Sequence, residues 1–118
     1  MTLKQLLQRW SELEPERCQY TEEKGDESPW YTINLDRGRA HIEYHRATQE
    51  DHALLQAIVQ KVIESQGWGW SILFSAKSVY RAGVKVTESY ISETARFPAY
   101  ALLAAYLKAL EVGKAQRV

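Results

Sequence analysis

The 118-residue sequence has a single cysteine, Cys18, and no excess of charge of either sign. One cysteine excludes an internal disulfide and any zinc site built from several cysteines, and it fits a reducing cytosol. The 15 basic and 15 acidic residues cancel, which argues against a surface made basic throughout for nucleic acid or anionic lipid, although a local basic patch remains open. We therefore expect a cytoplasmic protein without disulfides.

Long apolar runs are also missing. The longest stretches free of charged residues, 65–76 and 97–107, hold 12 and 11 residues, whereas roughly 18 are needed to span a bilayer. Residues 1–9 interrupt their apolar side chains with polar ones and lack the continuous apolar run of a signal peptide. Both absences predict a protein with no membrane contact and no secretion leader.

The motifs of common enzyme classes are absent as well. There is no Gly-x-Ser-x-Gly sequence, and Gly67-Trp68-Gly69 opens a predicted strand where a phosphate loop would lead through Gly-Lys-Ser/Thr into a helix. Cys18 has no identifiable base beside it, so we expect a small buried hydrophobe and not a nucleophile. We predict no catalytic residue and no cofactor, and more generally a protein that is not an enzyme.

The amino-acid composition is that of an ordinary globular protein. Hydrophobic residues make up 45% and charged residues 25% of the sequence, both close to the averages for soluble globular proteins. The length fits one domain and leaves no room for two cores. We expect a single domain over residues 1–118, with 114–118 as a frayed tail.

Three segments have apolar residues at helical spacing. The first covers residues 2–14 and the second covers 49–66, where Gly67 suits the left-handed residue that ends a helix. Two capping boxes precede them, formed by Thr2 with Gln5 and by Thr48 with Asp51. The third helix follows Thr94, a candidate N-cap, and ends before Gly113.

Alternating apolar and polar residues predict the strands. These lie at 18–22, 30–35, 39–45, 68–75 and 80–87, with a short additional strand at 89–93. Their short links cannot join parallel neighbours, which need crossovers of a dozen or more residues. The sequence therefore predicts an α+β fold, in which a mostly antiparallel sheet of about five strands packs with three helices.

Trp68 and Trp70 fall on the same side of their predicted strand as Ile72 and Phe74. Aromatic side chains remove large areas from water when they are buried. We therefore expect this side of the strand to be the buried one, packed against the helices.

Trp30 instead shares its face with Thr32 and Asn34. Most aromatic residues in a chain of this size serve the core, but these two neighbours are polar. We therefore expect Trp30 to be the most exposed tryptophan, and Trp30, Thr32 and Asn34 form a candidate partner-binding surface.

A second candidate surface lies on the polar side of the second hairpin. Lys77, Arg81 and Lys85 recur at even spacing, and Ser71 and Ser75 should lie on the same face of the neighbouring strand. Cations and hydroxyl groups together suit an anion, a nucleotide or nucleic acid. The alternative is that these cations form the solvent side of an exposed or edge strand, where lysine also prevents aggregation.

His41, Glu43 and His45 have side chains that ligate metals and raise the hypothesis of a metal-dependent enzyme. Positions four apart in a strand are roughly 13 Å apart, too far for His41 and His45 to hold one ion. The geometry thus favours a solvated polar face, and we predict no metal site.

A cluster of acidic residues precedes the second strand, and its members are Glu22, Glu23, Asp26 and Glu27. Such a cluster attracts a basic partner or a divalent cation. It is equally typical of a solvated hairpin tip.

The second half of the chain resembles a known family. A capped helix after Thr48, the sequence Gly67-Trp68-Gly69-Trp70-Ser71-Ile72, a hairpin, and residues 94–99 leading into an alanine-rich helix are similar to the phage ABA sandwich domain. The resemblance covers residues 48–112, with Arg96 and Phe97 as an insertion. It implies a sheet between helices and a phage or prophage origin, and the family brings no catalytic residue because it has no established activity.

We therefore predict a small, non-enzymatic binding protein that engages a protein partner through its antiparallel sheet and forms a homodimer. A phage or prophage accessory protein of this kind would engage a host or defence factor. The first alternative is an anion, nucleotide or nucleic-acid binder that uses Lys77, Arg81 and Lys85. The second is the metal-dependent enzyme with His41, Glu43 and His45.

Overall fold

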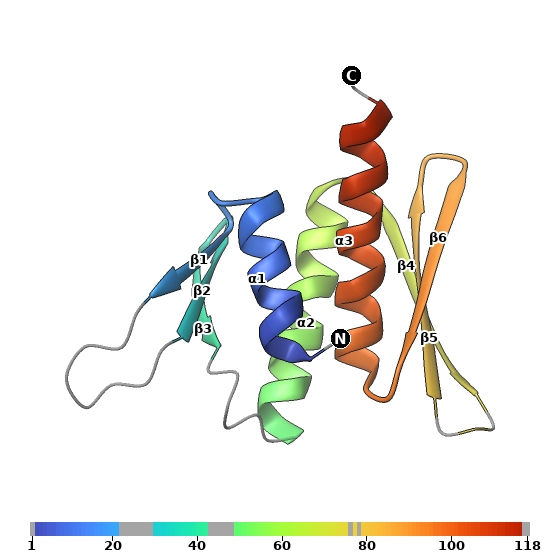
Figure 1. The fold of residues 1–118 in the computed structure, drawn as a ribbon, viewed down its shortest axis with the longest axis horizontal. Coiled ribbons are helices and arrows are strands. Elements are labelled where there is room, and N and C mark those ends of the chain that lie inside the picture. The colour runs from blue at the N-terminus through green and yellow to red at the C-terminus, as the bar shows by residue number, and fades with distance from the viewer. Residues whose placement is uncertain (1, 22–29, 43–48, 76, 78, 117–118) are drawn as a thin grey trace. The chain divides into compact units, whose positions relative to one another are not determined.

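The computed structural model of the chain describes residues 2–21, 30–42, 49–75, 77 and 79–116. It contains six strands and three helices in these ranges (Figure 1). The chain divides into two compact units, Met1–Asp51 and His52–Val118. Each unit has a sheet of its own, and the single domain over 1–118 stays a prediction.

The first unit combines one helix with one sheet. Helix α1 (Leu3–Leu13) precedes the strands β1 (Cys18–Thr21), β2 (Trp30–Leu35) and β3 (Gly38–Ile42). The three strands form an antiparallel sheet in the order β1-β2-β3. Helix α1 packs next to β1, and the side chains of its apolar stripe are buried, namely Leu3, Leu6, Leu7, Trp10 and Leu13.

The start of α1 confirms the predicted capping box. The Thr2 hydroxyl accepts a hydrogen bond from the Gln5 backbone N–H at 3.2 Å, and the Gln5 side chain accepts one from the Thr2 N–H at 2.8 Å. These bonds satisfy donors that a helix start otherwise leaves without partners. The second predicted capping box cannot be compared, because Thr48 lies outside the described residues.

The second unit places a three-stranded meander between two helices in sequence. Helix α2 (Gln49–Ser65) begins just before the boundary between the units and is followed by β4 (Gly69–Ser75), β5 (Val79–Val86), β6 (Ser89–Ala95) and α3 (Pro98–Gln116). The strands form an antiparallel sheet in the order β4-β5-β6. This arrangement leaves β4 and β6 as the edges of the sheet.

Helix α2 ends as the sequence predicts. Gly67 has a left-handed φ of +79°, its N–H donates to Glu64 O at 3.0 Å, and the Trp68 N–H donates to Ile63 O at 3.2 Å. These two bonds form a Schellman motif, which satisfies the last carbonyls of the helix. The chain thereby turns into β4.

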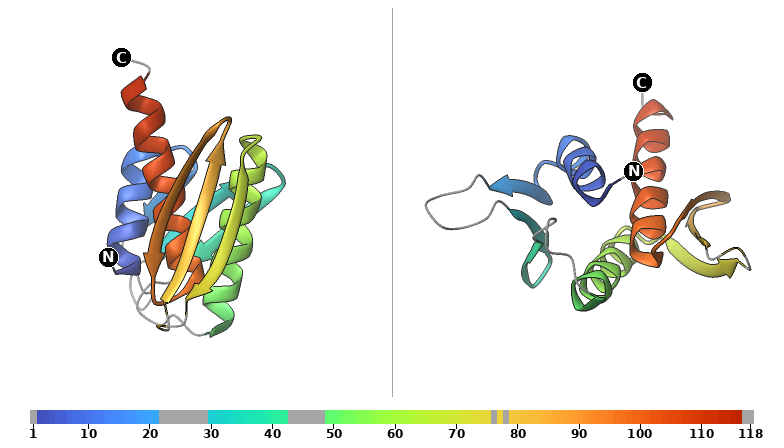
Figure 2. Two further views of the ribbon diagram at one scale, coloured as in Figure 1. Left: turned by 90° about the vertical axis from the view of Figure 1, so that its right-hand side faces the viewer. Right: turned by 60° about the horizontal axis from the view of Figure 1, so that its bottom comes forward.

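Helix α3 covers one face of the β4–β6 sheet, and it lies mainly over β5 and β6 (Figure 2). Ala82 and Val84 of β5 point to this inner face and are fully buried. On the far side of α3, His52 and Gln66, at the two ends of α2, hydrogen-bond to Tyr100 and Tyr106 of α3. The core of this unit therefore lies on both sides of α3.

The α+β class and the antiparallel pairing are confirmed, but the expectation of one sheet of about five strands is wrong. Six strands form two separate three-stranded sheets in the described part of the chain. Each sheet is a meander of consecutive strands, and in the sequence the long helix α2 lies between the two groups of strands. Strand periodicity predicts where the strands lie but not which strands pair.

The limits of the last helix also need correction. Thr94 lies inside β6, where it pairs with Arg81, and is not an N-cap. Pro98 opens α3, and the Phe97 carbonyl accepts the first helical bond from Ala101 at 3.0 Å. Proline suits the first helical position because its missing N–H would have no partner there. The helix then continues through Gly113 to Gln116, into the predicted frayed tail.

Candidate functional site

The face of the β4–β6 sheet that points away from α3 collects most of the residues predicted for an anion site. Cross-strand pairs share a face, and Ser71 pairs with Gly83 while Leu73 pairs with Arg81. We call this surface the outer face. It comprises Gly69, Ser71, Leu73, Ser75, Val79, Arg81, Gly83, Lys85, Tyr90, Ser92 and Thr94. In the described part of the chain, no helix of this unit lies over it (Figure 2).

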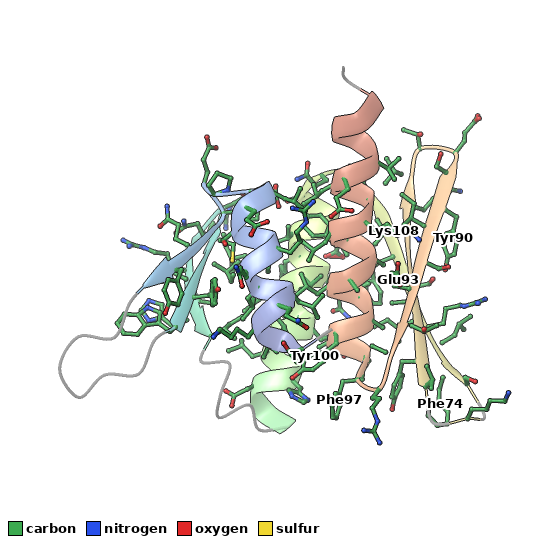
Figure 3. All side chains as sticks on the ribbon, in the orientation of Figure 1. Phe74, Tyr90, Glu93, Phe97, Tyr100 and Lys108 are labelled. Carbon is green, nitrogen blue, oxygen red and sulfur yellow. The ribbon has the colours of Figure 1, made fainter. Side chains whose placement is uncertain are left out.

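Tyr90 of β6 contacts both other strands across the outer face. Its ring reaches from β6 over Gly83, where any added Cβ would collide with the ring. Its hydroxyl hydrogen-bonds to the Ser71 hydroxyl on β4 at 2.5 Å. Figure 3 shows Tyr90 on the side of the sheet that faces away from α3. Gly83 is therefore buried although it belongs to an open face.

Arg81 and Lys85 lie on either side of this tyrosine. Both are exposed, and among the described residues neither has an ion-pair partner. They are four residues apart on one strand, which is about 13 Å, and the Tyr90 ring lies over the glycine midway between them. This spacing does not suit one small anion held by both cations, but it suits two separate acidic groups.

The other two residues of the predicted anion site are more peripheral. Ser75 lies at the end of β4 and is exposed. Lys77 lies in the turn that follows β4, and its backbone N–H donates to the Ser75 hydroxyl at 3.4 Å. The structure thus places Ser71, Ser75, Arg81 and Lys85 on one face, and Lys77 beyond its end.

The inner face of β4 is less buried than predicted. Trp70, Ile72 and Phe74 share this face as expected, but Trp70 is 37% and Phe74 is 65% exposed. Helix α3 lies mainly over β5 and β6, so the aromatic side chains of β4 extend past its cover. The expectation that Trp30 is the most exposed tryptophan is therefore wrong, because Trp30 is only half-buried whereas Trp70 is exposed.

The predicted surface of Trp30, Thr32 and Asn34 lies in the first unit, on the face of the sheet opposite to Ile33. Trp30 stacks on His41, with ring centroids 5.7 Å apart. Thr32 is 9% exposed, and the Asn34 amide donates to the Glu16 carbonyl at 2.8 Å. Two of the three side chains are thus covered or engaged within the fold, and a role of this surface in binding stays a prediction.

Of the three residues of the metal hypothesis, the structure describes only His41. His41 lies on β3 opposite Thr32, whereas Glu43 and His45 lie outside the described residues, as does the acidic cluster of residues 22–27. In the part of the chain that is described, no group of three or more His, Cys, Asp or Glu side chains could hold a metal ion.

Cys18 is fully buried against α1. Its thiol contacts the Leu7 carbonyl oxygen at 3.6 Å. Burial, together with the nearby carboxylate of Glu14, raises the pKa of the Cys18 thiol from 9.0 to about 12. A thiol that stays protonated at neutral pH is a poor nucleophile and a poor metal ligand.

The sequence predicts strand β4 but not its position at an exposed edge of the sheet. Strand β4 is an edge and contains no charged residue, and two of its most exposed side chains are Leu73 and Phe74, at 62% and 65%. The lack of charge over residues 65–76 is visible in the sequence. Only the strand order reveals that this stretch lies at an edge.

Comparisons with known proteins assign the chain to no family. A scan against protein-family models found no match, and no curated protein matches the sequence. Of the helices in the described ranges, none combines the length and the apolar character needed to cross a bilayer.

Proposed function

We propose that this chain is a non-enzymatic binding protein of the cytoplasm, and that the outer face of its β4–β6 sheet binds a protein partner carrying acidic groups. The observation that carries the proposal is the combination on this face of an exposed apolar side chain, Leu73, with two cations that have no anionic partner among the described residues. Protein interfaces combine apolar side chains with polar and charged ones. Complementary charge guides the partner to the site.

Several features favour a protein partner over nucleic acid. The chain has no net charge, and the outer face offers two cations separated by a tyrosine ring and flanked by Leu73. A nucleic-acid surface gains its affinity from neutralising many phosphates. Two carboxylates placed to reach Arg81 and Lys85, with an apolar side chain beside the first of them for contact with Leu73, fit this surface better.

A phage or prophage origin, which the resemblance of residues 48–112 to the phage ABA sandwich domain implies, would make the partner a host or defence protein. The buried, unreactive Cys18 is compatible with a reducing cytoplasm. Neither point carries the proposal, which depends on the outer face alone.

Charge reversal on the outer face tests the proposal. The intact chain is immobilised and exposed to an extract of the cells that carry the gene, as the wild type, as Arg81→Glu and as Arg37→Glu. Arg37 is an exposed cation between β2 and β3, so its replacement makes the same change in net charge on the first unit.

We expect at least one protein to be captured by the wild type and by Arg37→Glu, and to be reduced at least tenfold on Arg81→Glu. The same protein, purified, should bind the wild type more weakly as the salt concentration rises. Capture that does not distinguish Arg81→Glu from Arg37→Glu would overturn the proposal. So would binding of a 20-nucleotide single strand of DNA at physiological salt that Arg81→Glu abolishes, because the ligand class would then be nucleic acid.

A further inference from the structure

The cations of the β4–β6 sheet lie on its central strand and not on the edge strand β4. Edge strands usually carry lysine, proline or a bulge, which prevent pairing with another chain. Here the cations Arg81 and Lys85 lie on the central strand β5, while all seven residues of the edge strand β4 are uncharged. The backbone groups of β4 that point away from β5 have no strand partner in the described part of the chain.

The sequence of β4, Gly69-Trp70-Ser71-Ile72-Leu73-Phe74-Ser75, is nearly symmetric about Ile72. Trp70 and Phe74 are the aromatic residues two positions to either side of it, and the small residues Gly69 and Ser75 are three positions away. An antiparallel strand that pairs with an identical copy about its central residue places position 70 opposite position 74. Aromatic residues then lie opposite each other, as do the small residues at positions 69 and 75, while Ser71 lies opposite Leu73.

We propose that β4 pairs antiparallel with β4 of a second copy of this chain, with Ile72 on the two-fold axis. The pairing would join two three-stranded sheets into one sheet of six strands and satisfy the outward backbone groups of both edges. Two Trp70–Phe74 pairs would form on the inner face, where these side chains are now 37% and 65% exposed. Aromatic cross-strand pairs are among the more stabilising ones.

The charge distribution permits this dimer. The cations of each copy lie on β5, so three strand spacings, about 14 Å, would separate them from those of the other copy. This distance exceeds the Debye length of about 8 Å at physiological salt, so their repulsion is largely screened. The inference is independent of the proposed function, because both outer faces would stay open on the same side of the joined sheet.

Disulfide trapping tests the register. A residue on the two-fold axis of an antiparallel pair lies about 4.5–5.5 Å from its copy between Cα atoms, which is within the range of a disulfide. We expect Ile72→Cys to form a covalent dimer on mild oxidation. Thr94→Cys, an exposed position on the opposite edge strand β6, should remain a monomer on a reducing-agent-free gel. Cys18 is present in both variants and is too buried to compete.

The oligomeric state of the purified chain tests the pairing itself without any new cysteine. We expect sedimentation of the wild type to show a monomer–dimer equilibrium, and Phe74→Lys to weaken it at least tenfold. Thr94→Lys should leave it unchanged. A wild type that stays monomeric at all concentrations would overturn the proposal, as would a dimer that Thr94→Lys weakens and Phe74→Lys does not. Neither outcome affects the binding of a partner to the outer face, which the Arg81 and Arg37 variants test separately.

Discussion

At the scale of single residues, the outer face depends on the contact between Tyr90 and Gly83. Glycine weakens a strand interior because it has no side chain to pack, and here the ring of Tyr90 supplies the missing cover. The same contact positions the hydroxyl that bonds to Ser71 on β4. One aromatic side chain thus links all three strands and separates the two cations.

Gly83→Ala should therefore displace Tyr90 and break its bond to Ser71. We expect the free energy of unfolding to fall by about 1 kcal/mol, because a hydrogen bond of this kind contributes roughly 0.5–1.5 kcal/mol. Chemical denaturation measures the change. In the Gly83→Ala background, Tyr90→Phe should cost almost nothing more, whereas additive losses from the two substitutions would show that the Tyr90 hydroxyl keeps its bond to Ser71 without glycine at position 83.

Thr87 has a strained backbone. It lies in the two-residue turn between β5 and β6 and has a positive φ of 54°, a conformation that costs an ordinary residue about 1–2 kcal/mol. We expect Thr87→Gly to raise the free energy of unfolding by about 0.5–1 kcal/mol, after the greater freedom of glycine in the unfolded chain is subtracted. Thermal denaturation measures this change. Thr94→Gly is the control variant, because the same substitution inside β6 should destabilise the protein.

Cys18 should react slowly in the folded protein. A pKa of about 12 in place of 9.0 reduces the thiolate fraction near neutral pH by about three orders of magnitude. Alkylation by iodoacetamide at pH 8 should therefore be about 1000-fold slower in the native state than in denaturant. A native rate within tenfold of the denatured one would contradict the burial of this side chain.

The same pKa predicts how stability depends on pH. The folded state keeps the Cys18 thiol protonated, so its contribution is complete below pH 9 and decreases as the pH rises from 9 towards 12. Cys18→Ala, compared with the wild type over this range by denaturant unfolding, should lose less stability with rising pH. Equal losses in the two proteins would assign the effect to other groups.

At the scale of secondary-structure elements, the sequence predicts helix ends well where a side chain or a glycine sets them. Thr2 caps α1, and Gly67 ends α2 as predicted. The prediction fails at Thr94, because a threonine suits a strand as well as an N-cap, and the pairing of Thr94 with Arg81 decides between them. It also places the end of α3 too early, since Gly113 lies within a helix that continues past it.

Gly67 and Gly113 provide a matched pair of tests. At both sites the space that a Cβ would take has no neighbouring atom within 4 Å, so alanine changes the backbone preference and creates no clash. Gly67→Ala should lower the free energy of unfolding by about 1 kcal/mol, because φ is positive there. Gly113→Ala should raise it by up to about 1 kcal/mol, because alanine is the better helix former. Equal signs in denaturant unfolding would contradict one of the two assigned conformations.

At the scale of the whole molecule, the sequence predicts the α+β class but not the division into two sheets. Alternation shows that 30–35 and 68–75 are strands and which side chains share a face. It does not show that β4 is an edge, nor that α3 lies mainly over the neighbouring strands, because both depend on contacts between distant segments. For this reason alternation groups Ser71, Arg81 and Lys85 correctly but misses the exposure of Trp70 and Phe74.

Pairing of β4 with a second copy would link stability to concentration. A partner that binds only the folded chain stabilises it by about 2.7 kcal/mol when the concentration is 100 times the dissociation constant. If the two chains join through β4, the unfolding temperature of the wild type should rise steadily with protein concentration. That of Phe74→Lys should rise less over the same range, because its dimer is weaker. Calorimetry over a hundredfold range of concentration measures both, with Thr94→Lys expected to behave like the wild type. An unfolding temperature that is independent of concentration in the wild type would mean that the edge of β4 remains open in solution.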